Sequence, residues 1–318
     1  MLKLQDIVSA SKVLYGRINK TPLLSFESVN KIVGAEVYFK AEIFQKTGSF
    51  KIRGVLNKLN SLSRRQKKCG VVAMSVGDHA ISLAFAASIL HIPCVIVMPK
   101  NVVRSKVEAA KKLGAKIIFK RDNLWAECLK MQQCDGLIAI HPFDDLYIIA
   151  GHGTIGLEIL EDLPDVDVIL VPIGGGGLIS GVAAAVKLKK PKVKIIGVEP
   201  IGAPTMFLSL RAGGIIRLEK RNTIADGLSS PFVGKYTIAL TKKYVDKIVL
   251  VSDEEIIKSM KTILRCCKIL VEPSAAAAFA AILFRKLKIK AGAKIVCLLT
   301  GMNMGMEELL KLLGYKTI

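Results

Sequence analysis

The chain has 318 residues, of which 51% are hydrophobic and 23% are charged, a composition typical of a folded globular protein rather than a disordered one. This length exceeds what one small core supports, so we expect two lobes. The net charge of +21 could attract a polyanion, but the lysines are spread along the predicted helices and aromatic residues are too few to stack on bases. We expect a solvated basic surface and no nucleic-acid partner.

Nothing in the sequence predicts a membrane span or a targeting segment. The longest apolar region, Val166–Val186, is interrupted by Pro172 and a glycine run, and Lys3, Gln5 and Asp6 interrupt any apolar segment at the N-terminus. We therefore expect a cytoplasmic protein without a membrane partner. The 7 cysteines are an odd number and do not form the paired spacings of a zinc site, which favours reduced, structural thiols.

The first third of the chain predicts a helix over residues 5–19, which ends before Pro22, then a strand over 36–43 and a helix over 49–62. Arg64, Arg65, Lys67 and Lys68 indicate an exposed linker. From Gly70 onwards strands and helices alternate. The strands expected are 71–74, 94–98, 115–119 and 137–140, and the helices are 79–90, 104–113 and 123–133. This alternation predicts a small parallel sheet with helices on both faces.

A second alternating series begins near Asp144. It predicts strands over 168–171, 194–198, 247–251 and 294–299, with helices over 154–163, 178–189, 204–212, 253–267, 274–284 and 306–313. Ser252 and Glu255 have the spacing of a capping box. Four segments, Ser75–His79, Gly174–Gly177, Glu199–Pro200 and Thr300–Asn303, directly follow predicted strands. Since ligands bind at the carboxyl ends of parallel strands, we expect these segments to face one cleft.

Lys51 follows a small, hydroxyl-rich turn beside Phe50, where a helix is predicted to begin. A lysine is ordinarily a solvated surface charge, but two other segments favour a functional role. The run Gly174–Gly177 exceeds the one or two glycines that a tight turn needs, and its backbone N–H groups at a helix start suit a phosphate. It fits neither GxGxxG nor a nucleotide-binding P-loop. A reactive amine, a phosphate site and the Thr300 hydroxyl are the parts that hold pyridoxal phosphate.

Several collinear motifs between about Thr21 and Asn303 resemble the fold-type II pyridoxal phosphate enzymes, most closely the threonine dehydratase (deaminase) and serine racemase family. These motifs are Phe44–Gly54, Pro142–Asp145, Ile149–Thr154, Gly174–Gly181, Gly197–Pro200, Thr223–Leu228 and Val271–Pro273. The resemblance implies a two-domain, three-layer α/β architecture with parallel sheets, like the tryptophan synthase β-subunit. Residues 66–144 would form a small domain inserted into a large cofactor-binding domain, 1–65 plus 145–318. It also implies a homodimer or homotetramer.

By this resemblance, Lys51 would form the Schiff base with pyridoxal 5'-phosphate and remove the α-proton of a small amino-acid substrate. Phe50 would lie against the cofactor ring, Thr300 would bond its nitrogen, and the phosphate would be bound by Gly174, Gly175, Gly176 and Gly177. A neutral hydroxyl at the ring nitrogen favours loss of a β-substituent. The implied activity is a dehydratase (ammonia-lyase) that converts L-threonine, L-serine or both to a 2-oxo acid and ammonia. The substrate-binding residues would be Ser75, Gly77, Asp78 and His79.

The same segment departs from the family pattern. Asp78 stands where the family has an asparagine that bonds the phenolic oxygen of the cofactor, and a carboxylate there would repel anions unless it were protonated. Two alternatives remain open: a diverged enzyme with another amino-acid substrate (β-replacement or racemase), or a cofactor-holding protein without activity. Val76 replaces the serine that protonates the opposite face in racemases, which disfavours racemisation.

Three further departures concern the surroundings of the site. Many relatives hold a divalent metal with a glutamate matching Glu199, a carbonyl matching Ala203 and an acid two positions later, where this chain has Thr205. One carboxylate holds a hard cation poorly, so we expect weak or absent magnesium binding and assign no metal ligand. His152 replaces a frequent glutamine, and Met302 replaces a glycine beside the ring-nitrogen site.

Overall fold

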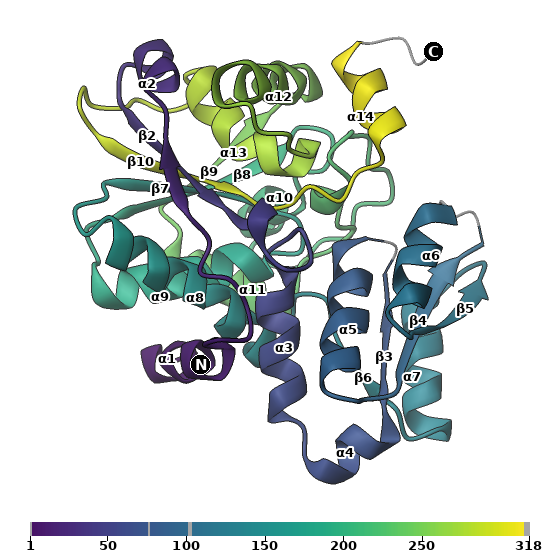
Figure 1. Ribbon diagram of the computed structural model, residues 1–318. Coiled ribbons are helices and arrows are strands. Elements are labelled where there is room, and N and C mark those ends of the chain that lie inside the picture. Colours follow the sequence, from purple (N-terminus) through teal and green to yellow (C-terminus); the bar gives the residue numbers. More distant parts are fainter. Residues whose placement is uncertain (1, 76, 101–103, 315–318) are drawn as a thin grey trace.

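Two sheets built mainly of parallel strands organise the protein in the computed structural model, which describes residues 2–75, 77–100 and 104–314 (Figure 1). The six-stranded sheet has the order β1-β2-β10-β7-β8-β9 and the four-stranded sheet the order β5-β4-β3-β6. Only β1 pairs antiparallel to its neighbour among the described strands. The large sheet contains β1 (Leu23–Ser25), β2 (Glu36–Ala41), β7 (Val168–Pro172), β8 (Lys194–Pro200), β9 (Lys247–Val251) and β10 (Lys294–Leu299). The small sheet contains β3 (Val71–Met74), β4 (Cys94–Pro99), β5 (Lys116–Lys120) and β6 (Ile138–Ala139).

Helices cover both faces of the large sheet (Figure 1). One face carries α2 (Glu27–Val33), α12 (Asp253–Cys267) and α13 (Pro273–Leu283), and the other carries α1 (Leu4–Leu14), α8 (Leu146–Asp162), α9 (Gly177–Lys189) and α11 (Lys235–Tyr244). Because side chains alternate along a strand, Leu170 of β7 enters the first core while Ile169 and Val171 enter the second. This layering confirms the expected α/β architecture with parallel sheets.

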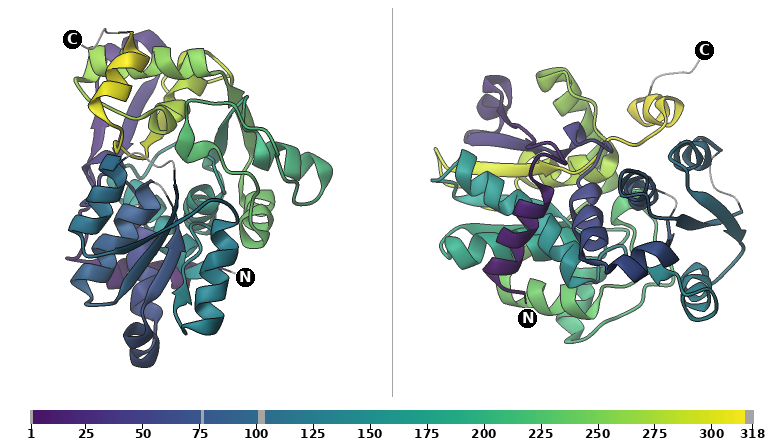
Figure 2. Two further views of the ribbon diagram at one scale, coloured as in Figure 1. Left: turned by 90° about the vertical axis from the view of Figure 1, so that its right-hand side faces the viewer. Right: turned by 60° about the horizontal axis from the view of Figure 1, so that its bottom comes forward.

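The small sheet is also covered on both faces (Figure 2). Helices α5 (Asp78–Ile89) and α6 (Arg104–Lys112) lie on one face and α7 (Leu124–Cys134) on the other. Helix α3 (Lys51–Ser61) packs against both α5 and α8. Since α5 belongs to the small sheet and α8 to the large one, α3 joins the two layered units.

Two predicted segments were wrong. The basic stretch expected to be a linker forms α4 (Arg64–Cys69), whose start is stabilised by a capping box between Ser63 and Gln66. Helix α8 begins at Leu146 rather than at residue 154, because the carboxylate of Asp145 accepts hydrogen bonds from the first free N–H groups of the helix. Glycines within α8 concealed this helix in the sequence.

The sequence reading also missed β1, α2 and α11, and it extended the first helix beyond Leu14. The remaining elements are the short turns η1 (Glu42–Phe44) and η2 (Asp226–Leu228) and the helices α10 (Thr205–Ala212) and α14 (Met306–Leu313). The capping box of Ser252 and Glu255 at the start of α12 is confirmed. All seven cysteines are free thiols. No helix in the described parts of the chain combines the length and apolar character needed to span a bilayer.

Candidate active site

A cavity of about 560 Å³ opens where β3, β7 and β10 end. Its lining includes every residue that the sequence assigned to cofactor or substrate binding: Phe50, Lys51, Ser75, Gly77, Asp78, His79, Gly174, Gly175, Gly176, Gly177 and Thr300. Val76, on which the argument against racemisation rests, lies outside the described residues. Three of the four segments expected at one cleft therefore meet there.

Lys51 is the first residue of α3, and the local backbone directs its amine into the cavity. The N–H of Phe50 donates to the carbonyl oxygen of Thr300 at 3.1 Å, which ties the start of α3 to the end of β10. The Lys51 Nζ atom lies 5.0 Å from the centre of the Phe50 ring and donates to the carbonyl oxygen of Pro142 at 3.4 Å. Burial lowers the pKa of this amine, while the carboxylates of Asp78 and Glu272 oppose that shift. The neutral form is thus more accessible than in an ordinary lysine.

The four glycines form the turn between β7 and α9. Gly176 has a φ of 92°, a left-handed conformation that favours glycine. A Cβ atom on Gly175 would lie 2.3 Å from the Phe143 ring, and one on Gly174 would lie 2.7 Å from the carbonyl oxygen of Gly227. No side chain fits, so the cavity meets bare backbone at the positive end of α9. Free N–H groups and the helix dipole make this turn suitable for an anion.

Two carboxylates are held at the cavity by one asparagine. The side-chain amide of Asn303 donates to Asp78 Oδ1 at 2.8 Å and to the carbonyl oxygen of Thr47 at 2.9 Å. Its backbone N–H donates to Glu272 Oε2 at 3.1 Å. The other oxygens of Asp78 and Glu272 crowd Gly301, where a Cβ would lie 3.0 and 3.1 Å from them. The sequence reading expected Thr300–Asn303 to face the cleft but gave Asn303 no role, and it did not place Glu272 at the site although Glu272 occurs in a motif that it singled out.

Two buried histidines near the cavity are held neutral. Burial is the main cause that lowers the pKa of His79 to about 3, and its Nε2 lies 3.4 Å from the carbonyl oxygen of Ile140. The ring of His152 lies edge-on to the Phe50 ring, with 4.8 Å between the ring centres, and burial likewise lowers its pKa well below 6.5. Lys51 is consequently the only positively charged side chain among the described residues that line the cavity.

Phe143 and Asp144 support the glycine turn, a role that the sequence reading did not assign. The Asp144 carboxylate accepts hydrogen bonds from the backbone N–H groups of Lys235, Tyr236 and Thr237, at 2.8–3.1 Å, and thereby caps α11. This fixes the segment that presses the Phe143 ring against Gly175. The available signal was the segment Pro142–Asp145, which the sequence analysis noted only as part of a resemblance.

The expectation that Glu199–Pro200 faces the cleft was wrong. Both residues belong to β8 and neither lines the cavity. The buried carboxylate of Glu199 instead accepts hydrogen bonds from the backbone N–H groups of Met206 and Phe207 at the start of α10, and burial raises its pKa to about 8. The Thr205 hydroxyl donates to the carbonyl oxygen of Ser230, and Ala203 is buried. Whether a metal binds there stays a prediction.

Comparison with known proteins adds independent information. Residues 14–301 match the family described as pyridoxal-phosphate dependent enzymes. The L-threonine ammonia-lyase of Thermotoga maritima is 44% identical over 306 residues, which are 95% of this chain and 76% of that protein. The serine racemase of Oryza sativa subsp. indica is 42% identical over 274 residues, 85% of this chain and 80% of that protein. The structure of maize serine racemase has a TM-score of 0.93 at 38% identity and covers 98% of this chain and 96% of its own.

Proposed function

Because this chain belongs to the family of pyridoxal-phosphate-dependent enzymes, we propose that it is an ammonia-lyase (dehydratase) acting on L-threonine, L-serine or both. The products would be a 2-oxo acid and ammonia. The observation that carries the proposal is the meeting of Lys51, the glycine turn and Thr300 in one cavity. Two relatives named L-threonine ammonia-lyase, 44% and 39% identical to this chain, support the substrate class.

The residues present fit the cofactor of the family. The bare backbone of Gly174–Gly177 suits its phosphate, the Lys51 amine suits its aldehyde, and the Thr300 hydroxyl suits its ring nitrogen. Phe50 offers an apolar surface beside the amine. Bound pyridoxal phosphate supplies an electron-withdrawing ring that makes the α-proton of an amino acid acidic.

Lys51 would act as the base for that proton. A base must be neutral before it accepts a proton, and burial lowers the pKa of this amine toward the working pH. The carbonyl of Pro142 orients the amine. The N-terminus of α5, which contains Asp78 and His79 and follows Ser75 and Gly77, lines the same cavity. Its positive dipole end would attract the carboxylate of the substrate.

Asp78 favours a second candidate, an enzyme of the same family with a different amino-acid substrate. Its carboxylate lies at the start of α5, where it would repel the substrate carboxylate that the helix attracts. Other relatives at 38–42% identity are named L-threo-3-hydroxyaspartate ammonia-lyase and serine racemase. Val76 has no hydroxyl group, which counts against a racemase. A cofactor-holding protein without turnover is the remaining possibility.

The test is the release of 2-oxo acid by the cofactor-loaded protein from L-threonine, L-serine and a panel of other amino acids. We expect release from threonine or serine, and a loss on the order of 10³-fold in Lys51→Ala because the base is gone. Lys46→Ala, an exposed lysine of the same turn, is the control and should retain activity. A fully loaded protein that releases no oxo acid from threonine or serine would refute the dehydratase assignment, and turnover of another amino acid would favour the second candidate.

We further propose that the protein works in the cytoplasm as a homodimer or homotetramer. We also propose that its basic surface does not bind nucleic acid. Analytical ultracentrifugation tests the assembly, where a monomer at micromolar concentration would refute it. Salt-sensitive retention on nucleic acid combined with no turnover would instead support a binding protein.

A further inference from the structure

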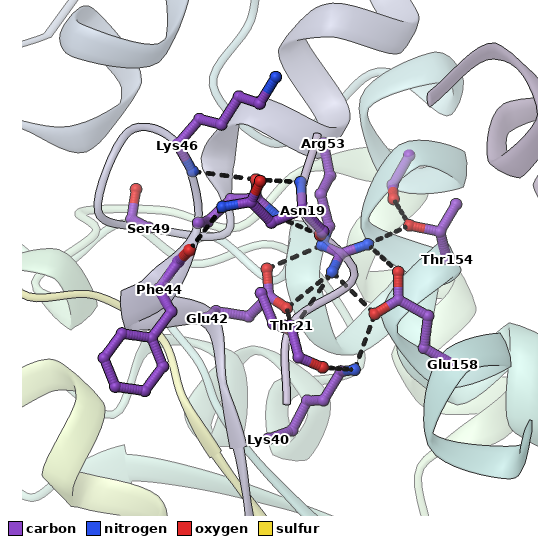
Figure 3. A network of polar contacts seen from close by, with 12 residues as sticks. Asn19, Thr21, Lys40, Glu42, Phe44, Lys46, Ser49, Arg53, Thr154 and Glu158 are labelled. Carbon is purple, nitrogen blue, oxygen red and sulfur yellow. Dashed lines mark hydrogen bonds and ion pairs between the residues drawn. The ribbon is translucent and has the colours of Figure 1, made fainter. Parts of the chain in front are cut away.

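Arg53, two residues after Lys51, enters a buried network of charges beneath the start of α3 (Figure 3). Its fully buried guanidinium donates from Nε to Glu42 Oε2 at 2.7 Å and from Nη2 to Glu42 Oε1 at 2.8 Å. It also donates from Nη1 and Nη2 to the two carboxylate oxygens of Glu158 at 2.6 and 2.9 Å. Two bidentate pairs on one guanidinium fix its position and orientation.

Lys40 completes the network from β2. Its fully buried Nζ donates at 2.7 Å to the carbonyl oxygen of Thr21 and lies 2.7 Å from Glu158 Oε2. The Thr21 hydroxyl donates a hydrogen bond to Glu42, and Arg53 donates one to the Thr154 hydroxyl. Burial would raise the pKa of Glu158, but Arg53 and Lys40 hold it below its ordinary value, so the carboxylate is ionised. Two positive charges therefore meet two negative charges.

The network lies where α3 and α8 approach closely at a glycine of each helix. A Cβ on Gly151 of α8 would lie 2.3 Å from the carbonyl oxygen of Arg53, and a Cβ on Gly54 of α3 would lie 2.8 Å from that of Ile148. The backbones of α3 and α8 thus touch directly at this crossing. The ion pairs of Arg53 with Glu42 and Glu158 hold the first turn of α3 against η1 and α8 (Figure 3).

We propose that Arg53, Lys40, Glu42 and Glu158 are positioning residues that hold Lys51 in place while adding no net charge beside it. This inference rests on the proposed role of Lys51. Apolar side chains of similar volume commonly stabilise a core as well as a buried ion pair does, so stability alone does not require the network. The zero net charge of these four residues matters here because the pKa of the Lys51 amine depends on few charges.

The titratable groups near Lys51 come from several elements. They are Asp78 and His79 of α5, Glu272 before α13, His141 after β6 and His152 of α8. The histidines are neutral, so two carboxylates oppose the effect of burial. The network contributes Arg53, Lys40, Glu42 and Glu158, and Asp162, Glu161 and Lys20 lie at its solvent edge. Removing one network charge would leave an uncompensated charge in a network that begins two residues after Lys51 on α3.

Removing charges of opposite sign tests the proposal. Glu158→Gln leaves an excess positive charge, which disfavours the ammonium form of Lys51, whereas Lys40→Gln leaves an excess negative charge, which favours it. The readout is the pH dependence of the rate at which protein stripped of cofactor captures pyridoxal phosphate, followed by visible absorption. Capture consumes the neutral amine, forms one C=N bond and releases the aldehyde oxygen as water. We expect the midpoint to fall by about half a pH unit in the first variant and to rise by about as much in the second.

The double variant Lys40→Gln/Glu158→Gln restores the charge balance, so its midpoint should return to that of the parent. Glu161→Gln makes the same chemical change on an exposed residue of α8 and should leave the midpoint unchanged. Denaturant unfolding verifies that each variant folds, and Lys40→Met removes the same charge if Lys40→Gln does not fold. Equal midpoints in all variants, or single-variant shifts of the same sign, would overturn the proposal. A parent protein that captures no cofactor would instead refute the role of Lys51.

Discussion

At the scale of single residues, burial and two carboxylates have opposite effects on the pKa of Lys51. Burial favours the neutral amine, and Asp78 and Glu272 favour the ammonium ion. Asn303 holds both carboxylates in place, through its side chain and its backbone N–H. Asp78 therefore has a defined electrostatic effect on Lys51, whichever substrate the cavity accepts.

Asp78→Asn should move the acidic limb of the kcat/KM profile to lower pH. Removing a carboxylate that stabilises the ammonium form lowers the pKa of Lys51, so the neutral base is populated in more acidic solution. We expect a shift of roughly half to one pH unit, measured with the substrate that turns over fastest. Asp226→Asn is a matched control, because Asp226 also lines the cavity but is not one of the two carboxylates that oppose the effect of burial on Lys51. A shift to higher pH would contradict this account.

Sequence patterns revealed the residues that occur in local motifs and missed those joined over long distances. Lys51 and Gly174–Gly177 could be predicted to lie at one cavity because a helix start and a glycine run are visible within a few positions. Asn303, in contrast, lies 225 positions after the Asp78 that it bonds. The contact exists only because β3 and β10 end at the same cavity, and no local pattern contains that information.

At the scale of elements, the turn between β7 and α9 determines whether an anion can approach the backbone. Its geometry depends on neighbours from elsewhere in the chain: the Phe143 ring fills the space beside Gly175, and the backbone of Phe143 lies beside Gly177. Asp144 in turn ties the Phe143 segment to α11. The ring therefore has little room to retreat from an added side chain.

Gly175→Ala should weaken cofactor binding by at least tenfold and destabilise the fold by about 1–3 kcal/mol, the usual cost of overpacking. The added Cβ would lie 2.3 Å from the Phe143 ring, so the turn or the ring must move. Absorbance titration with pyridoxal phosphate and denaturant unfolding measure the two effects. Gly214→Ala, where a Cβ meets nothing within 4 Å, is the control. Unchanged binding in Gly175→Ala would show that the turn does not contact the cofactor.

Element boundaries could be predicted where the signals that begin and end a helix or strand lie within that element's own sequence. The small sheet and most strands of the large sheet follow the predicted alternation. Helix α8 was predicted too short because Gly151 and Gly153 read as loop residues, yet their missing side chains allow α3 and α9 to approach. Helix α4 was missed because its basic residues resemble a solvated linker, although Ser63 caps it. Close contact with α3 and α9 accounts for the glycines of α8, whereas a local capping box accounts for α4.

At the scale of the whole molecule, two layered units enclose the cavity and α3 links them. We propose that residues 66–144 form the small domain and that 1–65 plus 145–318 form the large one. Limited proteolysis that releases a stable fragment near these boundaries would support the division. Buried histidines from both parts, His79 and His152, also make the stability of the whole chain sensitive to acid.

The free energy of unfolding should fall as the pH drops below 6.5. The pKa of His79 is about 3 in the folded chain and that of His152 is also lowered, against an ordinary 6.5. Below pH 6.5 the unfolded chain therefore binds protons that the folded chain does not, and stability present above that pH is lost. Each histidine can contribute at most about 1.4 kcal/mol per pH unit.

Chemical denaturation between pH 7.5 and 5 measures this dependence. His152→Gln removes one titrating group while keeping similar volume, so its stability should decline less steeply with acid than that of the parent. His91→Gln, which changes an exposed histidine, is the control. Parallel curves for the parent and His152→Gln would contradict the assignment of a neutral, buried imidazole.

The most direct test of the central claim is to locate the covalent link between chain and cofactor. Borohydride reduction of the cofactor-loaded protein, followed by proteolysis and mass spectrometry, fixes the cofactor permanently on the lysine that holds it. The account predicts one pyridoxyl-phosphate group per chain, on Lys51, and none after substitution of Lys51 by alanine. A label on a different lysine, or no label on a protein saturated with pyridoxal phosphate, would contradict it.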